Sequence, residues 1–451
     1  MEMERRKGII AVPFPIQGHI NPMLRFCSSL AAATAGRGGA ASIHVTLVLT
    51  HGVAKSVQSL SLPPLIHAFE FVSDGNDDGP PSTFEEYRSR LQASVSEGVA
   101  AVIGRRRSAA ELLLYDSMMP WLAEIGRAGG LRVAALFTQS ASVCAVYYRM
   151  LRGCSDLACS PDSRGLPEFS YFGDISEQVK SFIVNQASNM SVADWLLFNT
   201  FNDLEEEAVR WMSEKWAVKT IGPLVPRKTQ RTPLFKQERI ELYESDDEGC
   251  MAWLDKQRPN SVVYVSFGTV VVWSEEQMLE IATALVESDK PFLWAVRESE
   301  ESKLPSGLLD PNEKGLLVRW CPQAEVLSHE SVACFVTHCG WNSVLEAVCS
   351  GVPVVGMPQI VDQPANARLV EDVWRVGVRV KVGDEEEKGI VPREEIKGCV
   401  ARVTGGDEFR RNAMKWKALA EGALVGGGSS HANIRDFVSQ LDSRPSRSSS
   451  S

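Results

Sequence analysis

Residues 320–363 read WCPQAEVLSHESVACFVTHCGWNSVLEAVCSGVPVVGMPQIVDQ, and this stretch decides the fold. Its two apolar runs, 333–337 and 353–357, predict buried parallel strands, and helical patterns alternate with them. Polar side chains gather where these strands end. A hydrophobic core does not need such a collection, whereas a nucleotide joined to a sugar needs each of these groups. We therefore predict a ligand site at the carboxyl edge of a sheet.

The same alternation of strands and helices runs through the rest of the chain. With 451 residues, the chain exceeds what one hydrophobic core usually organises. The predicted fold class is α/β, with two doubly wound domains facing a central cleft. Apolar runs expected as strands are 9–14, 43–50, 112–115, 133–137 and 195–198 in the first half, and 262–267, 291–296 and 315–320 in the second.

Composition shifts predict where the domains meet. A stretch rich in Pro, Arg, Lys and acids without clear periodicity is expected as a linker, and the Ser-rich end of the chain as disordered. The predicted segments are a first domain at 1–225, a linker at 226–249, a second domain at 250–430, a helix at 431–443 that returns towards the first domain, and a disordered tail at 444–451.

Composition also limits the partners. Lys and Arg number 47 against 57 Asp and Glu, a net charge of -10, which argues against nucleic acid and anionic membranes. No stretch approaches the roughly 20 apolar residues of a membrane span. The ten cysteines include no CxxC pair, and no secretory h-region opens the chain, so we expect free thiols in the cytoplasm. We expect no bound metal, because no ligand cluster has suitable spacing, and a monomer.

The segment around His338 has the features of a diphosphate site. His338 ends strand 333–337, and Asn342 and Ser343 open the next helix. A helix N-terminus offers unpaired N–H groups to an anion, and His338 adds a donor. Glu346 lies one turn after Asn342 on the same face, where its carboxylate suits ribose hydroxyls. Asn342 and Ser343 are also good N-cap residues, so each alone indicates only helix initiation.

Two further positions allow both a functional and a structural interpretation. Trp320 closes a strand, where an indole either stacks on a base or packs in the core. Asp362 and Gln363 follow strand 353–357, where they either fix sugar hydroxyls or form a polar turn.

The first half offers a candidate general base. Strand 9–14 leads into QGHINP, where Gly18 is expected to adopt an unusual backbone and Asn21-Pro22 to begin a helix. His19 then faces the cleft, and with an ordinary pKa near ~6.5 it can accept a proton. The alternative is a histidine satisfied within the helix start. Asp116 ends another strand and is suited to hold the second ring nitrogen of His19.

The whole pattern resembles the signature box of plant family 1 UDP-sugar glycosyltransferases, and nearly the whole chain shares the likeness. The segments PFPIQGHINPM and LLYDSMMPW resemble those that carry the His-Asp pair in this family. VSDG at 72–75, FTQS at 137–140 and FNTFNDLE at 198–205 resemble the family 74 subgroup. The box residues that match are Trp320, Gln323, His338, Trp341, Asn342, Ser343, Glu346, Asp362 and Gln363.

This resemblance implies a GT-B fold of two Rossmann-like domains, with the acceptor on the first and UDP-glucose on the second. It implies that Trp320 stacks on uracil, His338 binds phosphate and Glu346 binds the ribose. Asp362 and Gln363 would hold the sugar, and Gln at the last position is associated with glucose. Thr269 and Cys321 complete the expected donor contacts. One departure is Ile360-Val361, which replaces an aromatic-hydroxyl pair common in the family.

The expected reaction is an inverting transfer of glucose, with His19 as base and Asp116 as its partner, and with no cofactor besides the donor substrate. The subgroup acts on small phenols, carboxylic acids, thiohydroximates and terpenoid or steroid alcohols. The expected partners are therefore a UDP-sugar and a small apolar acceptor. Candidate residues for an apolar acceptor pocket are Phe84, Met118, Met119, Trp121, Val143, Tyr147 and Phe169.

Three other functions fit less well. A nicotinamide oxidoreductase would need GxGxxG after its first strand, which is missing here. A P-loop phosphotransferase would need GxxxxGK[ST], and none occurs. A noncatalytic nucleotide-sugar sensor would need the second-half box but not His19 and Asp116.

Overall fold

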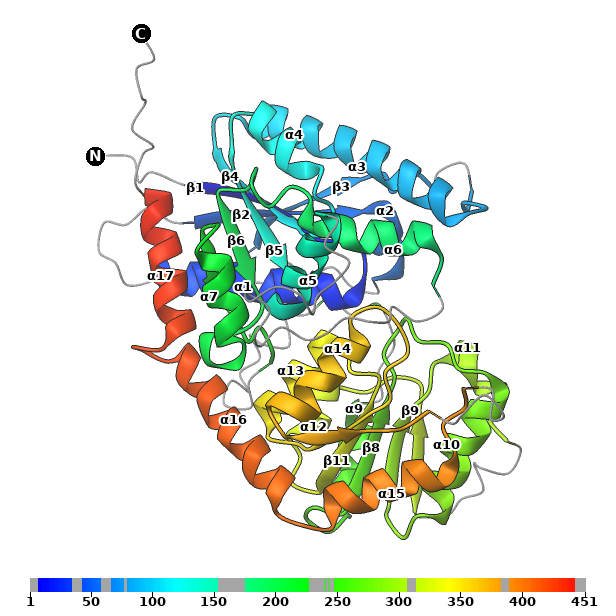
Figure 1. Ribbon diagram of the computed structural model, residues 1–451. Helices are drawn as coiled ribbons and strands as arrows, with labels where there is room; N and C mark the ends of the chain where they lie inside the picture. Colours follow the sequence, from blue (N-terminus) through cyan, green and yellow to red (C-terminus); the bar gives the residue numbers. More distant parts are fainter. Residues whose placement is uncertain are drawn as a thin grey trace.

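The computed structural model describes residues 7–34, 43–57, 66–76, 79–152, 175–226, 240, 242, 247–305, 314–382 and 389–442. These residues form two parallel sheets, one in each half of the chain, flanked by helices (Figure 1). This architecture confirms the predicted pair of doubly wound domains.

The first sheet has seven strands in the order β3-β2-β1-β4-β5-β6-β7, all pairing in parallel. Its central strands are mostly apolar because both faces of the sheet are covered. In β1, Ile9 and Ala11 enter one core and Ile10 and Val12 enter the other. The strands are β1 (Lys7–Val12), β2 (Ile43–Thr50), β3 (Ile66–Val72), β4 (Ala110–Asp116), β5 (Arg132–Phe137), β6 (Trp195–Phe198) and β7 (Val218–Thr220).

Amphipathic helices cover this sheet. In α3 the buried residues recur every three or four positions, for example Leu91, Val95 and Val99, which places them on one face. The α3 N-terminus is capped by the Thr83 hydroxyl, which accepts from the N–H of Glu86 at 3.2 Å. The helices are α1 (Gln17–Thr34), α2 (His51–Ser56), α3 (Phe84–Arg106), α4 (Leu122–Ala128), α5 (Ala141–Leu151), α6 (Glu177–Val184) and α7 (Glu206–Ser213), with 3₁₀ turns η3 (Asn185–Ala187) and η4 (Asn202–Leu204).

The second sheet has six parallel strands in the order β10-β9-β8-β11-β12-β13. They are β8 (Val262–Ser266), β9 (Phe292–Ala295), β10 (Gly315–Val318), β11 (Val332–Thr337), β12 (Val354–Gly356) and β13 (Gly377–Arg379). The helices are α9 (Asp247–Leu254), α10 (Glu275–Glu287), α11 (Glu298–Glu301), α12 (Gln323–Leu327), α13 (Trp341–Ser350), α14 (Gln363–Arg368), the π-helical η6 (Leu369–Val373), α15 (Arg393–Thr404), α16 (Glu408–Leu424) and α17 (Ser429–Asp442).

Every predicted strand is present, but three strands were not predicted. β7 and β13 have three residues each, which is too short for a period-2 pattern to stand out. β3 is an edge strand whose central residues are half-buried or exposed, so its sequence IHAFEFV lacks a continuous apolar run.

The last helix, α17, packs on the first half of the molecule (Figure 1). Its Ile434, Phe437, Val438 and Leu441 enter the core beneath α1. Arg132 donates to the carbonyls of Gln440 and Leu441 at 2.9 Å each, which satisfies carbonyls at the C-terminus of the helix. The chain thus ends by joining its second half to its first.

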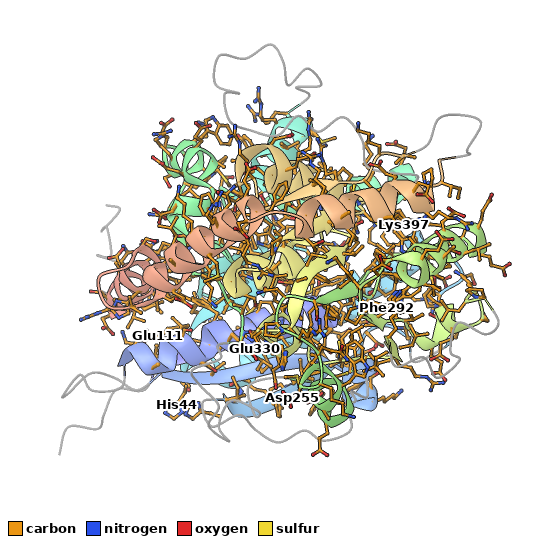
Figure 2. The ribbon with its side chains drawn as sticks, turned by 90° about the horizontal axis from the view of Figure 1, so that it is seen from below. His44, Glu111, Asp255, Phe292, Glu330 and Lys397 are labelled. Atoms are coloured by element: carbon orange, nitrogen blue, oxygen red, sulfur yellow. The ribbon has the colours of Figure 1, made fainter. Side chains whose placement is uncertain are left out.

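The surface carries many ion pairs. Lys397 of α15, labelled in Figure 2, lies 2.9 Å from Glu287 and 3.0 Å from Glu394. Among the helices described, none is long and apolar enough to span a bilayer.

Candidate active site

A cleft of about 1360 Å³ lies at the carboxyl ends of both sheets and is lined by residues from both halves. In open α/β sheets, this edge is where ligands bind. Of the residues predicted as sites, the cleft brings together His19, Met118, Thr269, Trp320, Cys321, Gln323, His338, Trp341, Asn342, Ser343, Glu346, Asp362 and Gln363.

His19 and Asp116 meet as predicted. Asp116 ends β4 and is fully buried, and its Oδ2 lies 2.8 Å from His19 Nδ1. Its other oxygen accepts from the N–H of Met118 at 3.0 Å. The Thr138 hydroxyl lies 2.9 Å from the same ring nitrogen. These contacts favour the tautomer with its proton on Nδ1, and so leave Nε2 to accept a proton.

The start of α1 differs from the prediction. The helix begins at Gln17, ahead of Asn21-Pro22, and Gly18 is helical rather than unusual in its backbone. Because Pro22 has no N–H, the carbonyl of Gly18 lacks its helical donor. Asn342 of the second half donates its amide Nδ2 to that carbonyl at 2.7 Å. A Cβ on Gly18 would lie 3.0 Å from the same nitrogen, so glycine permits this close approach.

The start of α13 lies at the cleft, and its first N–H, that of Trp341, bonds to the Asp362 carboxylate. Its N-cap is Gly340, which has no capping side chain, so Asn342 and Ser343 are not the caps that one reading of the sequence expected. The first N–H groups of a helix lack intrahelical partners and attract anions. The Trp341 indole is buried and donates to the carbonyl of Asn199 at 2.8 Å. Trp341 therefore supports the helix start with its side chain in the core.

His338 is neutral in this setting. Burial, against an opposing hydrogen bond to the Ser266 backbone and with a smaller contribution from the charge of Arg297, lowers the pKa of His338 to about 4. The ring lies between two glycines. A Cβ on Gly268 would come within 2.7 Å of the ring, and one on Gly340 within 2.4 Å. A neutral imidazole has one N–H, which here is bonded to the Ser266 backbone, so His338 brings no positive charge to the site.

Hydrogen bonds from Arg297 and Gln359 fix the loop that carries Thr269. Arg297 donates to the carbonyl of Thr269 at 2.6 Å and also to that of Val271. Gln359 donates to the carbonyl of Val272 at 2.9 Å. These hydrogen bonds satisfy three carbonyls of the loop and fix its backbone beside the cleft.

Asp362 and Gln363 begin α14 at the cleft. Desolvation raises the pKa of Asp362 to about 6, partly offset by its bond from Asn366 at 2.8 Å. The Gln363 Oε1 accepts from the N–H groups of Gln359 and Ile360 at 3.0 and 3.1 Å, which leaves its NH₂ for another acceptor. Val361 has a φ of 62°, an uncommon conformation for a β-branched residue. Strain of this kind often accompanies functional sites.

Trp320 and Glu346 complete the second-half side of the cleft. Trp320 lies beyond the end of β10, is half-buried and lines the cleft, so the interpretation as a core residue does not hold. Burial raises the pKa of Glu346, and a hydrogen bond from Gln323 opposes the shift. His329 also lines the cleft, and its Nε2 lies 3.1 Å from Asp255, which is labelled in Figure 2.

Most of the described residues predicted for the acceptor pocket do not line this cleft. Of the described candidates only Met118 lines the cleft. Met119, Val143 and Tyr147 are buried in the first-half core, and Phe84 and Trp121 pack against it. Their apolar character reflects core packing, and Phe169 lies outside the described residues. The residues that line the first-half side and were missed include Ile16, Thr138, Gln139, Ile183 and Gln186, joined by Ile360 and Val361 from the second half.

Their position directly after a strand would have identified two of these missed residues from the sequence. Thr138 and Gln139 directly follow β5, so they occupy the same carboxyl edge as Asp116. Ile183 and Gln186 belong to α6 and η3, and no sequence pattern distinguishes them.

Comparison with known proteins agrees with this geometry. The family model described as UDP-glucoronosyl and UDP-glucosyl transferase matches residues 234–421. The chain is 40% identical to UDP glycosyltransferase 9 of Catharanthus roseus over 96% of each chain. It is 38% identical to UDP-glycosyltransferase 74E1 of Arabidopsis thaliana, over 97% of this chain and 100% of the other. The crystal structure of Os79 from O. sativa with UDP matches with a TM-score of 0.84 and 34% identity, covering 96% and 100% of the two chains.

The paired sheets and their shared cleft define a glycosyltransferase of the GT-B fold. Among enzymes of this class, the chain belongs to the UDP-glycosyltransferase family, and its relatives include plant members of group 74. The resemblance inferred from the signature box is therefore confirmed.

Proposed function

We propose that this enzyme transfers glucose from UDP-glucose to a hydroxyl or carboxyl group of a small apolar plant metabolite, with inversion at the anomeric carbon. The observation that carries the proposal is the His19–Asp116 pair: His19 lines the same cleft as the signature box, and the buried Asp116 bonds to it. A binding protein would need the box but not a base. The relative Os79 supports the acceptor class, since it has been solved with U2F and a trichothecene.

In the proposed reaction, Nε2 of His19 takes the proton of the acceptor hydroxyl. The acceptor oxygen forms a bond to the anomeric carbon of glucose while the bond from that carbon to the diphosphate oxygen breaks. The electron pair leaves with UDP, and the positive N-terminal end of α13, with His338 beside it, stabilises the new charge. Asp116 stabilises the imidazolium, which then gives up its proton to solvent or product. Attack opposite the leaving group inverts the configuration.

The donor contacts in this proposal follow the family pattern. Trp320 stacks on uracil beside Cys321, Glu346 binds the ribose hydroxyls, and Asp362 and Gln363 bind glucose. The apolar residues at the mouth, such as Ile16 and Met118, favour an acceptor with a hydrophobic body.

The proposal also covers the compartment, the oligomeric state, the metal requirement and the roles of the two domains. It acts as a cytoplasmic monomer without a metal. Residues 1–225 bind the acceptor and residues 250–430 bind the donor. All described cysteines are free thiols, as expected in a reducing compartment.

The test is a mass-spectrometric screen of phenols, carboxylic acids and terpenoid or steroid alcohols against UDP-glucose, UDP-galactose and UDP-glucuronate, with and without EDTA. The expected product is one hexose heavier than its acceptor, forms best from UDP-glucose, and persists in EDTA. Tight UDP binding without transfer to any acceptor would support a sensor instead. A preference for another sugar would overturn the assignment of the donor.

A further inference from the structure

Tyr264 of β8 is buried on the donor side of the cleft and opens the segment YVSFGT, which resembles the family, but the sequence gives it no role of its own. Its ring stacks on Phe335 with centroids 4.8 Å apart. Its hydroxyl, however, reaches the site: it donates to Gln323 Oε1 at 3.0 Å and lies 3.2 Å from the Cys321 thiol. A phenol has one hydrogen, so the thiol donates the second bond.

Gln323 connects the Tyr264 hydroxyl to Glu346 and Ser343 through hydrogen bonds. Its Nε2 donates to Glu346 Oε2 at 2.6 Å and to the Ser343 hydroxyl at 3.1 Å. Both amide hydrogens are thereby used, and Tyr264 occupies the amide oxygen. Gln323 in this arrangement has no free hydrogen for a nucleotide. Its chemical role is to hold the Glu346 carboxylate at the start of α13.

We infer that Tyr264 is a positioning residue for the nucleoside: through Gln323 it fixes the carboxylate of Glu346 that reads the ribose hydroxyls. The inference rests on the proposed function, which places the ribose at Glu346. The same hydroxyl also steadies Cys321, next to the base-stacking Trp320. Burial raises the pKa of Tyr264, so the hydroxyl keeps its proton and remains a donor.

Removing the hydroxyl separates this role from packing. Tyr264→Phe retains the ring that stacks on Phe335 but leaves Gln323 Oε1 without its donor. The Gln323 side chain then samples other rotamers, and Glu346 loses its orientation. His19 belongs to the other half of the molecule, so the base is not affected.

The experiment compares UDP with 2′-deoxy-UDP by isothermal titration calorimetry. The wild type is expected to bind UDP more tightly, because the 2′-hydroxyl reaches Glu346. Tyr264→Phe should weaken UDP binding about tenfold, the value of one buried hydrogen bond, and should weaken 2′-deoxy-UDP much less. In the same variant, KM for UDP-glucose rises while kcat at saturation stays unchanged. Tyr148→Phe is the matched control, since Tyr148 lies on α5 against Trp216, outside the cleft.

A double-mutant cycle completes the test, because Tyr264 is inferred to act through Gln323. In a Gln323→Ala background, Tyr264→Phe should no longer change the UDP to 2′-deoxy-UDP ratio. An unchanged ratio in the single variant, equal weakening of both nucleotides, or a full effect in the Gln323→Ala background would each overturn the inference. Failure of the proposed function is distinguishable, since the wild type would then transfer no hexose in the mass-spectrometric screen.

Discussion

Replacing Asp116 by Asn removes one acceptor from a group that uses two. The carboxylate accepts from His19 Nδ1 at 2.8 Å and from the Met118 N–H at 3.0 Å. An amide has one oxygen and one NH₂, so it retains at most one of these bonds. If the oxygen stays on Met118, the NH₂ faces Nδ1 and selects the tautomer that is protonated on Nε2. That tautomer cannot accept the proton of a substrate hydroxyl.

The size of the effect follows from the role of the base. General-base help is worth ~10²–10⁴ in rate, which corresponds to about 3–5 kcal/mol of activation free energy. We expect Asp116→Asn to lower kcat by this factor for a phenol or alcohol acceptor. A carboxylic acid, with a pKa near ~4, is already ionised at neutral pH and loses less than about tenfold.

The assay is the initial rate of glucoside formation, measured by liquid chromatography with a phenol and with a carboxylic acid of similar size. Asp255→Asn is the matched control, because Asp255 pairs with His329 at 3.1 Å but is largely exposed to solvent. The control should keep both rates. Equal losses on the two acceptors, or an undiminished rate with the phenol, would refute the assignment of His19 as base.

Four further predictions follow from the same geometry. Gly340→Ala forces the nearby His338 ring to move and should raise KM for UDP-glucose by about tenfold. The control Gly104→Ala, in open space on α3, should leave KM unchanged. Equal KM values for the two variants would contradict the close packing of His338 against Gly340. Asn342→Ala breaks a bond between the two halves and should lower kcat about threefold to tenfold; an unchanged kcat at saturating donor would show that the bond is dispensable. Glu205→Gln removes the charge that accepts N–H groups at the start of α5, and urea unfolding should show a free energy of unfolding lower by about 2–3 kcal/mol; no change would disprove this stabilising role. The pKa of Asp362, raised by desolvation to about 6, lies above that of the unfolded chain, so the folded protein takes up this proton first as the pH falls from 7 to 5. UDP-glucose should then bind more weakly while UDP does not, and Asp362→Asn should remove the difference; parallel titration curves for both ligands would exclude this role.

Several of the predicted residues lie at the end of a strand or directly after it. Asp116 and His338 could be placed because parallel strands bring their carboxyl ends to one edge. His338 therefore lines the cleft, and Asp116 lies buried next to His19, which also lines it. The same rule would have found Thr138.

The acceptor side could not be predicted because it depends on packing between elements distant in sequence. Met118 and Met119 are adjacent, yet one lines the cleft and the other is buried. The contact that Tyr264 makes with Gln323 could not be predicted from the sequence either. Its position within an apolar strand predicts a core residue, and only the tertiary structure brings its hydroxyl to Gln323.

The most direct test of the central claim is the anomeric configuration of the product, read from the H1–H2 coupling in its proton NMR spectrum. A base facing the donor across the cleft predicts direct displacement, and hence a β-glucoside from the α-linked donor. An α-glucoside would mean that the configuration is retained, and would contradict a single displacement driven by His19.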